Sequence, residues 1–187
     1  MDQITADKTG GGTGRTMAPS WATGVCRGLW SSRCLEVVYV PDNPLSHILA
    51  TLEREYPRVR ATLATREEEA IGIAAGLYLG GGRPVVMMQS SGLGNTLNAI
   101  GSLLLPYQIP MLLVVSMRGD PGEWNAAQVP MGRAVRPVLD ALGVQHLTVE
   151  RPEEAEATVR AVARLAFSTR RPAAVLLPRT LTATWET

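Results

Sequence analysis

Residues 65–78 read Thr65-Arg66-Glu67-Glu68-Glu69-Ala70-Ile71-Gly72-Ile73-Ala74-Ala75-Gly76-Leu77-Tyr78, with three carboxylates ahead of an apolar run. This pattern predicts a helix in which Thr65 is the N-cap and Glu68, three residues later, is its capping-box partner. No such structural role falls to Glu67, which lines up at helical spacing with Ile71. Because a helix that is apolar on every side is normally buried, Glu67 is expected to face an apolar surface. A carboxyl group in such surroundings is typical of residues that exchange protons.

Three glycines, Gly72, Gly76 and Gly80, share the opposite side of the same predicted helix. A glycine inside a helix costs about 1 kcal/mol relative to alanine. Their four-residue spacing therefore indicates that another backbone approaches this side closely. The approaching backbone belongs either to the sheet of the same domain or to another subunit, and the sequence leaves both possibilities open.

Strands and helices alternate on both sides of this segment. Helices are expected at residues 20–31, 45–55, 67–79, 95–105, 131–142 and 153–169. Short apolar runs predict strands at 35–40, 59–63, 84–88, 109–116, 144–149 and 173–177. This order predicts an α/β fold, a doubly wound, six-stranded and mainly parallel sheet with helices on both faces. Residues 1–18 are expected to be a disordered tail, and residues 19–187 one domain.

The loops at 41–44, 64–67, 89–94 and 117–130 all follow strands and are expected to meet at the carboxyl edge of the sheet, where ligands bind. Asp42 and Asn43 lie between prolines, as in a turn that caps a helix. Residues 89–94 are expected to form a glycine-containing loop, either a tight turn or an anion site at a helix start. The length of the 117–130 loop hints at function, although a solvated loop fits equally well.

Composition excludes several functional classes. The 187 residues carry 18 basic and 17 acidic side chains, a net charge of +1, which gives no electrostatic reason to bind nucleic acid or an anionic membrane. No apolar run is long enough to span a bilayer, and no signal-peptide pattern is visible. Two histidines and two widely spaced cysteines argue against a metal site on this chain. We therefore expect a cytoplasmic protein.

Four segments together resemble the pyrimidine-binding domain of thiamine-diphosphate enzymes, above all the alpha subunits of sulfopyruvate decarboxylases and the matching part of phosphonopyruvate decarboxylases. They are residues 40–43, 65–79, 88–95 and 127–134. The sequence departs from the family pattern at Ser90, where asparagine is frequent, and at Asn43, where serine is common. Both departures fall near the expected substrate edge.

The resemblance implies a fold, a cofactor and a set of site residues. In this family a glutamate contacts N1′ of the aminopyrimidine ring, and aligning the small residues 74–76 places it at Glu67, or at Glu68 if the alignment shifts by one. It implies decarboxylation of a 3-sulfo- or 3-phosphonopyruvate-like 2-oxo acid to an aldehyde and CO2. The implied cofactor-binding residues are Glu67, Asp42, Gln89, Ser91, Gly92 and Asn95. Arg118, Gln128 and Arg133 are the candidates for binding the substrate.

The family binds Mg²⁺ and the diphosphate through a Gly-Asp-Gly motif, which this sequence lacks, since Gly119-Asp120 is followed by Pro121. The resemblance therefore implies half of an enzyme, completed by a beta subunit that holds the Mg²⁺, in an α2β2 or larger assembly. Three alternatives stay open. They are a non-catalytic regulatory or scaffolding homologue, a carboligase subunit, and a doubly wound domain for another small molecule.

Overall fold

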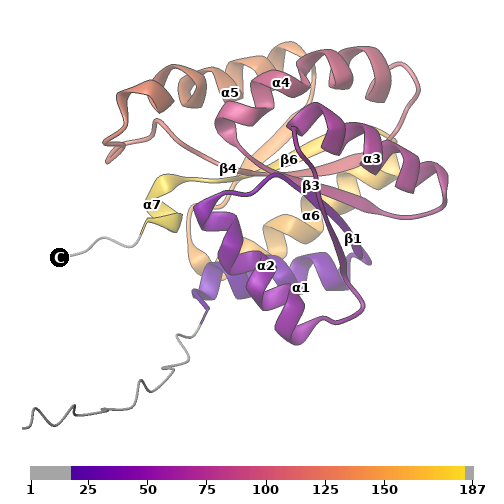
Figure 1. Ribbon diagram of the computed structural model, residues 1–187, viewed down its shortest axis with the longest axis horizontal. Helices are drawn as coiled ribbons and strands as arrows, with labels where there is room; N and C mark the ends of the chain where they lie inside the picture. Colours follow the sequence, from indigo (N-terminus) through magenta and orange to yellow (C-terminus); the bar gives the residue numbers. More distant parts are fainter. Residues whose placement is uncertain (1–17, 184–187) are drawn as a thin grey trace, which may run out of the picture.

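The computed structural model describes residues 18–183, so the predicted tail lies outside the described residues except for Ala18. Six parallel strands form one sheet in the order β2-β1-β3-β4-β6-β5 (Figure 1). The predicted α/β architecture is confirmed, and the sheet is parallel throughout. The strands are β1 (Glu36–Tyr39), β2 (Arg60–Leu63), β3 (Pro84–Gln89), β4 (Met111–Ser116), β5 (Gln145–Thr148) and β6 (Pro172–Leu177).

Helices cover the sheet in two layers (Figure 1). One layer holds α1 (Ser20–Ser31), α2 (Asn43–Glu55) and α6 (Ala155–Thr169). The other holds α3 (Glu67–Leu79), α4 (Ser90–Ala99) and α5 (Val129–Ala141). A π-helical turn, Ile100–Leu104, extends α4, and short 3-10 turns at Ala126–Gln128 and Pro152–Glu154 precede α5 and α6. A final short helix, α7 (Arg179–Thr182), was not predicted.

Successive residues of the central strands belong to alternate cores. Val37 packs into the α1, α2 and α6 layer, whereas the next residue, Val38, packs into the α3, α4 and α5 layer. Leu112 and Leu113 of β4 divide in the same way, and all four side chains are fully buried. A strand buried on both faces has no polar side, which is why these strands read as continuous apolar runs.

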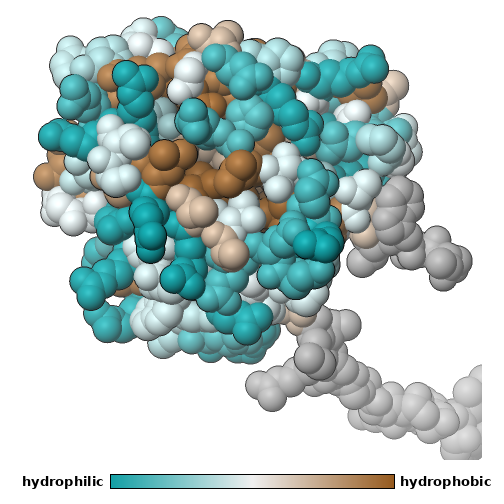
Figure 2. All heavy atoms as spheres, turned by 180° about the vertical axis from the view of Figure 1, so that it is seen from behind, coloured by the Kyte–Doolittle hydropathy of each residue, from teal (hydrophilic) through white to brown (hydrophobic). Residues whose placement is uncertain are grey.

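Strand β2 departs from the predicted coverage, because all four of its residues are exposed. It is the first strand in the sheet order and pairs only with β1. Leu63 leaves 60% of its surface open to solvent. The side turned away in Figure 1, which is not the side of β2, is largely hydrophilic, with apolar residues gathered near its middle and top (Figure 2). The described chain thus covers its central strands fully and its first strand hardly at all.

The glycine side of α3 faces open space. A Cβ built on Gly72 or Gly76 would meet no atom within 4 Å. Of the two alternatives for the approaching backbone, the sheet of the same domain is therefore excluded at Gly72 and Gly76 within the described chain. Contact with another subunit stays a prediction, and Leu79, 75% exposed at the end of the same helix, extends this open surface.

Within residues 18–183, no helix combines the length and the apolar character needed to cross a membrane.

Candidate functional site

Three polar side chains are linked where the central strands end. Asp42 follows β1, Gln89 is the last residue of β3, and Ser116 is the last residue of β4. Gln89 Nε2 donates to Asp42 Oδ1 at 2.9 Å, and the Ser116 hydroxyl donates to Asp42 Oδ2. The Ser91 hydroxyl donates in turn to Gln89 Oε1. The structure therefore joins three of the predicted cofactor-binding residues, Asp42, Gln89 and Ser91, in one network, together with Ser116, which the sequence did not single out.

Asp42 occupies the N-cap position of α2 but makes no side-chain capping bond. The predicted capping turn is therefore confirmed in the position of Asp42 at the start of α2, but the predicted cap through its side chain is not formed. Both carboxylate oxygens accept bonds from other strands, because those donors lie at the same edge of the parallel sheet.

The capping of α3 differs from the prediction by one residue. Arg66 takes the N-cap position, and the carboxylate of Glu69 accepts from the backbone N–H of Thr65 at 2.7 Å. Glu68 lies instead 3.0 Å from Arg66 Nε through Oε1. Its other oxygen, Oε2, is buried and has no hydrogen-bond partner in the described chain. Glu68 therefore stays open as the alternative acidic residue of the site.

Glu67, the first residue of α3, lies against α4. Asn95 Nδ2 donates to Glu67 Oε2 at 3.0 Å. A Cβ on Gly92 would come within 2.5 Å of Glu67 Cγ and closer still to its carboxylate, so only glycine leaves room for this side chain. Oε1 accepts no hydrogen bond from the residues the structure covers. The predicted trio of Glu67, Gly92 and Asn95 is thus brought together, with one oxygen anchored and one free.

The predicted loop at 89–94 is wrong, because α4 begins at Ser90 and includes both glycines. Two close approaches explain why glycines interrupt a helix here. Gly92 faces Glu67, and a Cβ on Gly94 would lie 2.9 Å from Met131 Cε. Ser90, one of the departures from the family pattern, is fully buried and accepts a hydrogen bond from the Arg118 backbone N–H at 3.0 Å.

Arg118 is committed to an ion pair with Glu123. Its Nε and Nη2 donate to the two carboxylate oxygens at 2.6 and 2.7 Å, and the Glu123 side chain is only 1% exposed. The bonds from Arg118, with further ones from the backbone N–H groups of Asn125 and Gly119, outweigh burial and lower the pKa of Glu123 to about 2. The charge of Arg118 is therefore compensated inside the chain, which argues against its predicted role as the free partner of an anion.

The other two predicted substrate residues lie on the same side, around the start of α5. Arg133 is exposed on α5 and, with Asp120 and Arg136, lines a cavity of about 700 Å³. Asp120 and Arg136 approach within 3.7 Å, so Arg133 is the member of this group without a carboxylate within ion-pair distance among the described residues. The side-chain oxygen of Gln128 is buried and has no hydrogen-bond partner in that part of the chain. Arg133 is thus accessible to a ligand, whereas Gln128 keeps an unused but buried acceptor.

No group of three or more histidine, cysteine, aspartate or glutamate side chains in residues 18–183 is arranged to hold a metal ion.

Comparison with known proteins places the sequence in a family. No protein-family model matches the sequence. The sulfopyruvate decarboxylase subunit alpha of Methanococcus maripaludis is 42% identical over 113 residues, which are 60% of this chain and 68% of that protein. The phosphonopyruvate decarboxylase of Streptomyces viridochromogenes is 34% identical over 149 residues, 78% of this chain but only 38% of that protein.

Among solved structures, the 2-oxoglutarate:ferredoxin oxidoreductase of Magnetococcus marinus superposes with a TM-score of 0.68. The match covers 89% of this chain and 29% of that one, at 17% identity, and supports the fold alone. Sequence identity over most of an alpha subunit carries the stronger conclusion. The chain belongs to the family of sulfopyruvate decarboxylase alpha subunits.

Proposed function

We propose that this chain is the alpha subunit of a thiamine-diphosphate-dependent decarboxylase. Its substrate is a 3-sulfo- or 3-phosphonopyruvate-like 2-oxo acid, which it converts to the aldehyde and CO2 in a site shared with a beta subunit. The observation that carries the proposal is the placement of Glu67, whose carboxylate has one oxygen fixed by Asn95 and one free. This arrangement occurs at the carboxyl edge of the sheet in a member of a decarboxylase family.

The residues at this edge fit thiamine diphosphate. The cofactor, when bound, supplies an electron sink for the loss of CO2. Glu67 Oε1 is the atom that would hold the proton shared with a ring nitrogen, and Asn95 keeps the carboxylate turned toward it. Gly92 supplies the space in which that carboxylate rests. Asp42, Gln89 and Ser91 are joined by hydrogen bonds, which orient each side chain before any ligand binds.

Two observations support a separate partner. Three of the relatives, 39–42% identical, are named as alpha subunits, a name that implies a partner subunit in those proteins. The described chain also leaves β2 and the glycine side of α3 uncovered. We assign the diphosphate and Mg²⁺ to the beta subunit, in an α2β2 or larger complex.

The substrate carries a second anion, a sulfonate or a phosphonate, next to its 2-oxo acid. Arg133 is the strongest candidate to bind it, because its guanidinium is exposed and has no carboxylate near it in the described chain. The unpaired Oε1 of Gln128 would accept a hydrogen bond from a ligand or a bridging water. Arg118 is better assigned to holding the loop through Glu123.

The test is reconstitution with the beta subunit, measuring aldehyde release and the binding of thiamine diphosphate by calorimetry. Glu67→Gln is expected to lower turnover by about a hundredfold or more, the range for loss of a proton-transferring group. Glu69→Gln is the matched control, because that carboxylate only caps the helix. Rapid turnover by the alpha chain alone would refute the shared site. Normal activity of Glu67→Gln, with Glu68→Gln inactive, would assign the role to the next residue.

A further inference from the structure

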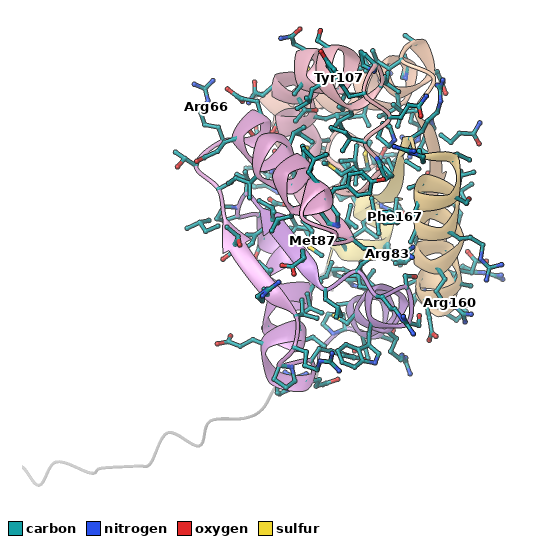
Figure 3. All side chains as sticks on the ribbon, turned by 90° about the vertical axis from the view of Figure 1, so that its right-hand side faces the viewer. Arg66, Arg83, Met87, Tyr107, Arg160 and Phe167 are labelled. Atoms are coloured by element: carbon teal, nitrogen blue, oxygen red, sulfur yellow. The ribbon has the colours of Figure 1, made fainter. Side chains whose placement is uncertain are left out.

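The opposite edge of the sheet, where the strands begin, carries a cavity of about 500 Å³ with an unusual concentration of positive charge. Arg33 lies between α1 and β1, Arg83 immediately precedes β3, and Arg160 and Arg164 project from α6. Figure 3 shows Arg83 beside Phe167, with Arg160 on the same side of the molecule. No acidic residue of the described chain lines this cavity.

None of the four guanidinium groups has a carboxylate within 4.0 Å in the part of the chain that the structure describes. Arginines close by do have one, since Arg27 pairs with Glu156 and Arg60 with Glu36. What sets the four apart is that they line one cavity together, without a carboxylate among its lining residues.

The surroundings supply little compensation. Arg160 and Arg164 are four residues apart on α6, a spacing at which like charges destabilise a helix. The carbonyl ends of α1 and α6 lie at this edge, but each contributes only about half of a negative charge. The thiol of Cys34 lies near Arg83, yet burial raises its pKa to about 11, so it stays neutral. Most of the positive charge in the cavity is therefore not compensated by other groups of the described chain.

Arg83 is held in a fixed position. Its guanidinium carbon lies 4.2 Å from the centre of the Phe167 ring, a cation–π contact that restricts the side chain. Its Nε is buried and has no hydrogen-bond partner in residues 18–183. A guanidinium that is oriented in advance loses less entropy when it binds the paired oxygens of a phosphate.

We propose that this cavity binds a compact oligophosphate, a di- or triphosphate group that is either free or part of a nucleotide. Several planar guanidinium forks around one cavity match several adjacent phosphates, each of which can accept two parallel hydrogen bonds. A cavity of about 500 Å³ admits such a group. The site is separate from the Glu67 edge and does not depend on the proposed decarboxylase activity.

The experiment is calorimetric titration of the full chain with inorganic tripolyphosphate, with ATP and with sulfate. Tripolyphosphate is expected to bind at one saturable site and sulfate far more weakly. Arg160→Gln and Arg164→Gln change exposed side chains and are expected to weaken binding about tenfold each, as for loss of a charge-assisted contact. Arg151→Gln, which removes the same charge beyond the carboxyl end of β5, is the matched control and should leave the affinity within about twofold.

If Arg151→Gln weakened tripolyphosphate binding as much as the cavity variants do, the effect would come from net charge alone and the proposal would be overturned. The absence of saturable binding would overturn it as well. Equal affinities for ATP and tripolyphosphate would assign recognition to the phosphates alone. Tighter binding of ATP would add a nucleoside contact, and both results support the site. Glu67→Gln should bind tripolyphosphate normally, which separates this inference from the decarboxylase proposal.

Discussion

Gly92 offers the sharpest test of how Glu67 is positioned. The change Gly92→Ala adds one methyl group, whose carbon would lie 2.5 Å from Glu67 Cγ and nearer still to the carboxylate. Carbon atoms in contact sit about 3.5 Å apart, so the Glu67 side chain must retreat by roughly 1 Å. The 3.0 Å bond from Asn95 Nδ2 does not survive such a displacement.

Gly92→Ala is expected to lower turnover more than it lowers the free energy of unfolding. A misplacement of about 1 Å in a catalytic group lowers turnover about a hundredfold, equivalent to about 2.7 kcal/mol of activation free energy. Overpacking costs about 1–3 kcal/mol of stability, partly offset by about 1 kcal/mol gained when alanine replaces a helical glycine. The variant is therefore expected to fold.

The assay compares Gly92→Ala with Gly94→Ala, two residues along the same helix. The methyl group of Gly94→Ala would meet only the flexible end of Met131, which can move aside, so this control should keep most of its activity. Turnover is measured with the beta subunit present. In the isolated chain, the side-chain amide resonances of Asn95 report the contact with Glu67. If Gly92→Ala turned over within about threefold of the parent while those resonances shifted, the observed position of Glu67 would not be the functional one.

Three further results are expected. Gly72→Ala should raise the free energy of unfolding of the isolated chain by about 1 kcal/mol in urea titrations, because its methyl group meets nothing within 4 Å. The same variant should assemble less well with the beta subunit if that surface is the interface, and unchanged assembly would place the interface elsewhere. Bonds from Arg118 lower the pKa of Glu123 from 4.5 to about 2, so its contribution to stability is complete above about pH 4.5 and disappears toward pH 2. Glu123→Gln should lose stability at neutral pH, and a difference from the parent that persisted at pH 2 would contradict this origin. Burial raises the pKa of Cys26 to about 12 and that of Cys34 to about 11, so iodoacetamide should modify neither thiol until the chain is unfolded.

The sheet could be predicted because its signal is local. Continuous apolar runs such as β4 need no tertiary information to be identified as buried parallel strands, and each of the six appeared within a few residues of its expected place. Glu67 was singled out because the sequence pattern gave the neighbouring Glu68 a capping role. The structure places Glu67 beside Gly92 and Asn95, and its catalytic role stays a prediction. The capping partner is Glu69 in place of Glu68, since the N-cap is Arg66 and not Thr65.

The features that the sequence did not reveal depend on how the folded chain packs, within a loop as well as between distant segments. Two glycines indicated a loop at 89–94, but Gly92 is there to admit Glu67 from another helix. The pairing of Arg118 with Glu123 depends on the path of a long loop, which no local pattern reveals. The basic cavity was not predicted at all, because its arginines come from three separate parts of the chain and meet only when the topology is known.

The bonds that tie Asp42 to Gln89 and Ser116 join the N-cap of α2, three residues after β1, to the last residues of β3 and β4, which are interior strands. This part of the site cannot loosen unless the sheet itself opens, so its amide protons should exchange only through global unfolding. Thermal inactivation and melting should accordingly coincide. Whatever mobility turnover requires must then come from the segment between β4 and α5, or from the protein that docks against it.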